Sequence, residues 1–272
     1  MTEAAPPGAP RGGLGGRATE RAVCVLAPNP GPMTLDGTNT WVLSEPGASE
    51  VVVVDPGPLD EGHLRAVLEE VGDRRVAAVL LTHGHPDHSE AVTRFAELAG
   101  APVRAVDPAY RVGDQGLAPG ETLAVDGLRL RVLEASGHTA DSVCFQLPDD
   151  HSVLTGDTVL GRGTTMVAHP DGRLGDYLDT LRRLRRITVE DGVRVVLPGH
   201  GPVLDDAQGA VDYYLAHRAN RLAQVETAVE NGYRTAPEVV AHVYSEVDRA
   251  LWPAAELSVR AQLEYLEEHG LI

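Results

Sequence analysis

Short apolar runs separated by polar turns extend from residue 21 to about residue 205, and they predict more strand than helix. Apolar spacing typical of helices predicts helices over 59–71, over 89–98 with Ser89 as the N-cap, and over 177–187. This irregular mixture favours an α/β fold. Strands are expected over residues 21–26, 50–54, 76–81, 102–106, 123–125, 128–133, 142–147, 152–155 and 194–197, and the second half of 33–43 alternates like a further strand.

The hydrophobic pattern changes after residue 205. Residues 207–230 predict one long helix, and residues 237–272 predict two shorter ones. We therefore divide the chain into a main domain, residues 21–205, and a small helical domain, residues 206–272. The helical domain either covers a site on the main domain or pairs with a second chain, and the pattern leaves the oligomeric state open.

Residues 1–20 are rich in Gly, Pro, Ala and Arg, and they predict a disordered N-terminal tail. This tail lacks the apolar segment of a signal peptide. No window reaches the ~18 consecutive apolar residues of a membrane span. We therefore expect a cytoplasmic protein that makes no membrane contact.

Composition narrows the function further. All 23 basic residues are Arg, so mechanisms that need a lysine nucleophile are excluded. The net charge of −17 disfavours binding to duplex DNA or to anionic membranes. Cys24 and Cys144 lie in apolar runs, and we interpret them as reduced core residues.

Four side chains that bind metals fall within six residues, directly after the apolar run 79–81. They are His83, His85, Asp87 and His88. Imidazoles and a carboxylate held this close together are costly unless a cation binds them. The stretch therefore predicts a metal site on the loop where a strand ends.

Three later turns repeat this arrangement, each with one metal ligand where an apolar run meets a glycine. They offer His138, Asp157 and His200. The combined set of five histidines and two aspartates is large enough to hold two divalent ions. Neutral imidazoles and carboxylates suit Zn²⁺ first, with Fe or Mn as substitutes.

The order and spacing of these ligands resemble the metallo-β-lactamase superfamily, whose signature His-x-His-x-Asp-His is complete here. The resemblance implies a four-layer αββα sandwich with the site at one sheet edge. It assigns His83, His85 and His138 to one metal, and Asp87, His88 and His200 to the other, with Asp157 as the bridge. Asp55 matches a family aspartate that braces the metal loop, although a plain turn role is an equal alternative.

A closer resemblance, to the beta-lactamase-like protein 2 group, covers nearly the whole ordered chain. It implies a C-terminal helical domain of winged-helix type. Members of that group include a zinc-dependent endoribonuclease of single-stranded RNA, and related fungal proteins are thioesterases. The segments that carry this resemblance are Asn29-Pro30-Gly31-Pro32, Gly37-Thr38-Asn39-Thr40, residues 156–161, residues 163–165 and residues 198–202, together with the helical tail.

These resemblances imply a dinuclear hydrolase in which a metal-bound hydroxide is the nucleophile. Asp87 would orient that hydroxide and pass a proton to the leaving group. Single-stranded RNA is the first predicted substrate, and a thioester or another small acyl ester is the alternative. β-Lactamase activity is expected to be minor at most, because Asp157 stands where one lactamase subclass uses cysteine. The acidic tail from residue 205 onward, with twelve acidic and five basic residues, opposes binding to RNA.

Two groups of residues are candidates for contact with the substrate. Thr38, Asn39 and Thr40 either present donors to a substrate oxygen or hold a turn and a strand. Three further residues follow Asp157 closely and are expected near the mouth of the site, where the arginine either meets an anionic group or is an exposed surface side chain. They are Arg162, Thr164 and Thr165. The dense basic run Arg182, Arg183, Arg185 and Arg186 is expected to form a solvated helix face that pairs with nearby acids.

Overall fold

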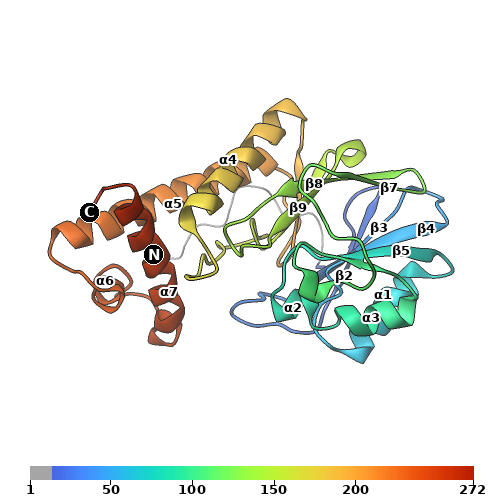
Figure 1. Ribbon diagram of the computed structural model, residues 1–272, viewed down its shortest axis with the longest axis horizontal. Coiled ribbons are helices and arrows are strands. Elements are labelled where there is room, and N and C mark those ends of the chain that lie inside the picture. Colours follow the sequence, from blue (N-terminus) through green and yellow to red (C-terminus); the bar gives the residue numbers. More distant parts are fainter. Residues whose placement is uncertain (1–13) are drawn as a thin grey trace.

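The computed structural model describes residues 14–272, so the prediction of a disordered tail lies outside it for residues 1–13. Two β-sheets pack face to face, and helices cover the outer face of each sheet (Figure 1). The C-terminal helices extend to one side of this sandwich. Within residues 14–272, no helix is both long and apolar enough to cross a membrane.

The first sheet has the strand order β1-β2-β3-β4-β5-β6. Its strands are β1 (Gly16–Arg17), β2 (Ala22–Leu26), β3 (Asn39–Leu43), β4 (Glu50–Val54), β5 (Arg75–Leu80) and β6 (Val103–Arg104). β1 pairs antiparallel with β2. Residues 16–17, which we expected in a disordered tail, are therefore part of the sheet, because pairing with β2 supplies hydrogen bonds that their composition does not reveal.

The second sheet has the order β11-β10-β9-β8-β7. Its strands are β7 (Thr122–Val125), β8 (Leu128–Glu134), β9 (Val143–Leu147), β10 (Ser152–Gly156) and β11 (Val195–Pro198). β7 and β8 form the predicted hairpin, with Val125 paired to Leu128 across the turn. Short 3₁₀ helices lie at η1 (Pro108–Tyr110), η2 (Pro148–Asp150) and η3 (Arg249–Leu251).

Alternation of side chains along the strands produces the layers. In β4, Val52 and Val54 point into the core between the sheets, whereas Val51 and Val53 pack beneath α1 (Glu61–Val71) and α3 (Val92–Ala99). In the second sheet, the outward residues pack beneath α4 (Leu174–Glu190) and the first half of α5 (Ala207–Glu230). The predicted four-layer αββα sandwich is therefore confirmed.

The region after the histidine-rich loop differs from the prediction. A short helix, α2 (Pro86–Ser89), precedes α3, so Ser89 ends one helix and does not cap the next. Its hydroxyl donates to the carbonyl of Gly84 at 2.9 Å. Pro86 starts α2 early because its ring fixes φ near the helical value and its missing N–H is not needed there.

The long helix α5 belongs to two cores. Ala210 and Tyr214 pack with the outer face of the second sheet, whereas Val225 and Val229 pack with α6 (Ala236–Val243) and α7 (Trp252–Glu268). A boundary at residue 205 thus separates the sandwich from a helix that completes its outer layer. The capping box of Thr235 and Glu238 begins α6.

Candidate metal centre

The predicted ligands follow the C-terminal ends of four strands, β5, β8, β10 and β11, and meet at one edge of the sandwich. β4 is parallel to β5 and β10 is parallel to β11, so each pair ends on the same side. His83 and His85 follow β5, Asp157 follows β10, and His200 follows β11. Residues far apart in the chain therefore meet where these strands stop.

The structure brings all seven predicted ligands together in two groups that share Asp157. In the first group, His85 Nδ1 lies 3.1 Å from both His83 Nε2 and His138 Nε2. His138 Nε2 lies 3.7 Å from Asp157 Oδ2. The four ligand atoms of this group all lie within 4.8 Å of one another.

The second group uses the other oxygen of the shared carboxylate. Asp157 Oδ1 lies 3.4 Å from both His88 Nε2 and His200 Nε2, and these two nitrogens are 3.2 Å apart. Asp87 Oδ2 completes the group, 3.0 Å from His200 Nε2. Each oxygen of Asp157 therefore faces a different group, which is the arrangement expected of a bridging ligand.

The outer nitrogens of three rings show which atoms face the groups. His88 Nδ1 lies 2.9 Å from Asp55 Oδ2, His138 Nδ1 lies 2.7 Å from the Met166 carbonyl, and His200 Nδ1 lies 3.1 Å from the Gly37 carbonyl. These partners only accept hydrogen bonds, so each Nδ1 carries the proton. The Nε2 atoms, with their lone pairs, therefore turn inward.

Converging lone pairs and carboxylate oxygens repel one another unless a cation lies between them. Ligands about 2.1 Å from a tetrahedral zinc lie roughly 3.4 Å from each other. The closest spacings within the two groups run from 3.0 to 3.7 Å. The donor set and its spacing therefore fit a pair of divalent ions.

Asp55 supports this arrangement from behind the metal loop. Its Oδ1 accepts the Thr82 backbone N–H at 2.8 Å, and its Oδ2 accepts the Thr82 hydroxyl at 2.6 Å as well as His88 Nδ1–H. These contacts fit the bracing role, one of the two alternatives that we gave for Asp55. We did not predict a role for Thr82. Its position between β5 and His83 was the sequence feature that could have indicated one.

Burial and neighbouring charges shift the pKa values in opposite directions. Burial holds the pKa of His83 well below its usual range, and it also lowers the pKa of His138. Burial lowers the pKa of His200 too, but the carboxylate of Asp157 outweighs it and raises that pKa to about 9. The pKa of His88 is raised well above its ordinary value by Asp157 and Asp55 in spite of burial. The second group thus attracts positive charge to the position that a cation would take.

Glycine is required beside the ligands for space. A Cβ atom on Gly199 would lie 2.7 Å from Asp157 Oδ1 and 2.8 Å from His88 Cε1. Such close approaches leave no room for a side chain at position 199.

Tyr110 is another residue that we did not predict. It packs on the metal loop and donates its hydroxyl to the Gly84 carbonyl at 2.8 Å.

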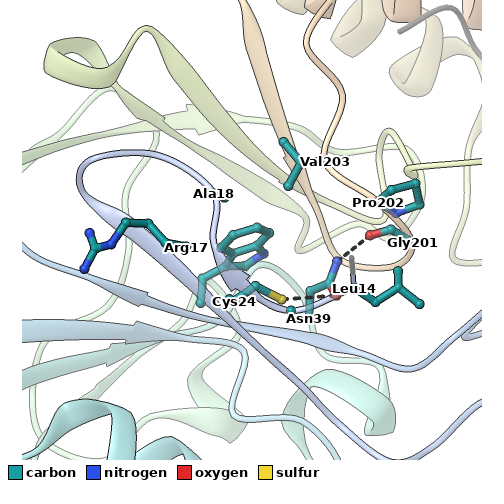
Figure 2. Close-up of a pocket in the computed structure, with 11 residues that line it drawn as sticks. Leu14, Arg17, Ala18, Cys24, Asn39, Gly201, Pro202 and Val203 are labelled. Carbon is teal, nitrogen blue, oxygen red and sulfur yellow. Dashed lines mark hydrogen bonds between the residues drawn. The ribbon is translucent and has the colours of Figure 1, made fainter. Parts of the chain in front are cut away.

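The side chains of residues 38–40, our candidates for substrate contact, form hydrogen bonds to other groups of the protein. Asn39 donates to the carbonyl of Pro198 at 3.0 Å. It also donates to the Gly201 carbonyl at 2.9 Å and accepts from Cys24 Sγ (Figure 2). A cavity of about 30 Å³ lies beside this side chain, behind the His200 loop. These contacts fit the alternative that we gave for the segment, in which it holds the strand and the loop.

The neighbouring threonines are also engaged. Thr38 is buried and its hydroxyl accepts from Asn29 at 3.0 Å. Thr40 donates to the Asp55 carbonyl at 2.7 Å and lies 2.8 Å from His63 Nε2. Both side chains therefore position the backbone that surrounds the metal centre.

The residues after Asp157 divide into inner and outer positions. Thr165 is buried, with its hydroxyl 3.3 Å from His138 Nδ1, whereas Thr164 is half-buried. Arg162 is 44% exposed and forms an ion pair with Asp36 of the neighbouring loop. Of these three predicted contacts, only Thr164 and Arg162 have side chains open to a substrate.

The basic run on α4 forms the predicted solvated face. Each of its arginines faces an acid on the surface, with N···O distances from 2.7 to 3.9 Å. The run is therefore neutralised along its length. The pairs are Arg182–Asp179, Arg183–Glu134, Arg185–Asp212 and Arg186–Glu190.

Comparison with known families agrees with this geometry. The profile described as "Metallo-beta-lactamase superfamily" matches residues 33–200, which contain both groups of ligands. The chain belongs to this superfamily. A second profile, "Beta-lactamase associated winged helix domain", matches residues 235–272 and identifies the C-terminal helices. With its His/Asp clusters, this superfamily member is a metal-dependent hydrolase.

Individual relatives cover much of the chain. The "Beta-lactamase-like protein 2 homolog" of Drosophila melanogaster is 31% identical over 274 residues, covering 93% of this chain and 90% of that protein. The "Atrochrysone carboxyl ACP thioesterase" of Aspergillus fumigatus is 34% identical over 224 residues, covering 78% of this chain but only 65% of that protein. The solved structure of a metallo-beta-lactamase family protein of Thermus thermophilus has a TM-score of 0.76 at 28% identity, covering 92% of this chain and 94% of that one.

Proposed function

We propose that this superfamily member hydrolyses an acyl thioester to a carboxylic acid and a thiol. Two divalent ions would occupy the centre, and Zn²⁺ is the ion that the donor set favours. Asp157 would bridge them. His83, His85 and His138 would hold one ion, and Asp87, His88 and His200 the other. When bound, such a pair polarises a carbonyl group and lowers the pKa of water towards ~7.

Asp87 is the residue that we propose for proton handling. Its side chain is 27% exposed, compared with 11% for Asp157, so it is the carboxylate that a water and a substrate can reach. A carboxylate in this position accepts a hydrogen bond from the attacking water and orients it. Arg162 and Thr164, at the outer positions, are the side chains that we propose to meet the rest of the substrate.

Charge is the observation that carries the choice of a thioester over RNA. The chain has a net charge of −17, and its dense arginine run is paired with acids. A protein that follows an RNA backbone gains most of its affinity from basic residues that meet phosphates. A thioester carbonyl requires no such surface.

The leaving group supports the same choice. A thiol has a pKa of about 8.5, so a thiolate can leave near neutral pH without receiving a proton from a side chain. A ribose alkoxide is a much stronger base than a thiolate, so an acid must protonate it as it leaves. The similarity to a fungal acyl carrier protein thioesterase supports the same chemistry.

The test compares thioesters with RNA on the zinc-loaded protein. Acyl thioesters of coenzyme A and of N-acetylcysteamine are followed by thiol release, and an unstructured single-stranded RNA oligonucleotide by gel electrophoresis. We expect thioester turnover, reduced at least ~100-fold by Asp87→Asn because an oriented proton acceptor contributes this much. Asp60→Asn, which alters only the cap of α1, serves as the matched control. Cleavage of RNA by the wild type with no thioester turnover would overturn the proposal.

A further inference from the structure

The 17-residue segment 157–173, between β10 and α4, contains no helix or strand but carries part of the metal centre. It begins with the shared ligand Asp157. Further along, the Met166 carbonyl accepts the Nδ1–H of His138 at 2.7 Å. Irregular backbone of this length must find hydrogen-bond partners outside itself to hold one conformation.

Two buried tyrosines of the outer helices supply some of these partners. Tyr177 of α4 donates its hydroxyl to the Thr158 carbonyl at 2.7 Å. Tyr214 of α5 accepts the Leu160 N–H at 2.8 Å. Both tyrosines are fully buried, so these hydrogen bonds form away from water. The first half of the segment is therefore fastened to the helical layer.

Arg218 of α5 holds the second half. Its guanidinium donates to the Thr165 carbonyl and lies over the ring of Tyr177, 5.1 Å from the ring centroid. The residue is only 5% exposed, and among residues 14–272 its buried Nε atom has no hydrogen-bond partner. Burial of a guanidinium is strongly unfavourable unless its contacts compensate for the lost hydration. A side chain that served packing alone would not need this charge.

Thr165, whose carbonyl accepts the hydrogen bond from Arg218, lies next to the residue that supports the metal ligand His138. Thr165 directly precedes Met166, and its own hydroxyl lies 3.3 Å from His138 Nδ1. A shift of the Thr165 carbonyl would move the Thr165 hydroxyl and the Met166 carbonyl, which are the two groups that face Nδ1 of His138. The orientation of the ring, and of the Nε2 atom that faces the first group, therefore depends on Arg218.

We propose that Arg218 is a positioning residue for the metal centre, acting on His138 through the backbone of Thr165 and Met166. The inference rests on the metal centre and not on the identity of the substrate. It also connects the C-terminal helices to the metal centre, because the C-terminal half of α5 packs with α6 and α7. The same segment meets α7 directly, where His169 N–H donates to the Leu257 carbonyl at 3.3 Å.

The experiment measures metal affinity in Arg218→Met, Arg218→Lys and the control Arg221→Met. Arg221 lies on the same helix, over the ring of Tyr244 at 4.7 Å, so its replacement removes an equal charge away from the segment. Zinc affinity is determined by competition with a chromophoric chelator, and the Co²⁺-substituted protein is examined by visible absorption. Both readouts are independent of any substrate.

We expect Arg218→Met to weaken one of the two bound ions by ~10–100-fold, the usual effect of losing a group that orients a ligand. Its Co²⁺ spectrum should change as well. Arg218→Lys should restore part of the affinity, because it keeps the charge but lacks the rigid fork of the guanidinium. Arg221→Met should match the wild type.

A merely structural role predicts a different pattern. In that case the midpoint of thermal unfolding falls in Arg218→Met, but folded protein binds both ions with wild-type affinity and spectrum, and the proposal is overturned. If Arg218→Met does not fold, Arg218→Lys decides. A several-fold loss of affinity in this variant supports positioning, and wild-type affinity refutes it.

Discussion

The replacement Asp55→Asn tests whether Asp55 determines which ring nitrogen of His88 carries the proton. In the wild type, Asp55 Oδ2 accepts both the Thr82 hydroxyl at 2.6 Å and His88 Nδ1–H at 2.9 Å. An asparagine would place an NH₂ group against these two donors if its oxygen kept the Thr82 N–H. His88 would then have to move its proton to Nε2, and no lone pair would face the second group.

The magnitude follows from the hydrogen bond that is lost. A hydrogen bond to a charged group contributes about 1.5–3 kcal/mol. Because about 1.4 kcal/mol corresponds to a factor of ten, the affinity for the second ion should fall by roughly 10- to 150-fold. The first group does not contact Asp55, so the affinity for the first ion should change much less.

Chelator competition monitored by absorbance measures both affinities. Asp60→Asn is the matched control, since its carboxylate accepts only the N–H of His63 at the start of α1. If Asp55→Asn bound both ions as tightly as the wild type, the carboxylate would not be setting the His88 tautomer, and the reasoning would be refuted.

Three further outcomes are expected. Gly199→Ala should lose at least one bound ion in metal analysis, because its Cβ would lie 2.7 Å from Asp157 Oδ1. Burial raises the pKa of Cys24 and of Cys144 to about 12, so both thiols should resist a thiol reagent at pH 8 in the folded protein and react after unfolding. Removal of zinc by a chelator should lower the free energy of unfolding by about 2.7 kcal/mol relative to protein with free zinc at 100 times its Kd.

Each of these outcomes has a direct check. Gly175→Ala is the control for the glycine, since its Cβ would meet Tyr265 at an ordinary 3.6 Å; equal metal loss in both variants would contradict the steric argument. Rapid thiol reaction in the folded state would show that the cysteines are accessible. Identical urea midpoints with and without chelator would show that folding and metal binding are not coupled.

The positions of the metal ligands could be predicted from the chain alone. A strand end followed by a glycine and a metal ligand constrains the backbone locally, and four such turns in one chain indicate a shared site. A buried strand at β4 was equally predictable, because apolar residues facing both of its sides, such as Val52 and Val53, require one. The four-layer arrangement itself was implied by the resemblance to the metallo-β-lactamase superfamily.

The roles of individual polar side chains could not be predicted in this way. The turn chemistry of residues 37–40 is consistent with both substrate contact and support of the fold. Only packing against the His200 loop commits the Asn39 amide to Pro198 and Gly201. Similarly, Gly16 and Arg17 carry no strand signal, and their pairing depends on the neighbouring edge of β2.

The sequence by itself thus determined the candidate metal ligands and an α/β mixture of elements, because ligand type and strand pattern are local properties, and its resemblance to a known superfamily implied the kind of fold. Tertiary structure decided the rest. The tautomer of His88, the ring orientation of His138 and the use of Arg218 each depend on an atom from a distant segment. Hydrogen bonds between segments that are separated in the chain leave no periodic trace in it, and they become visible only when the chain is folded.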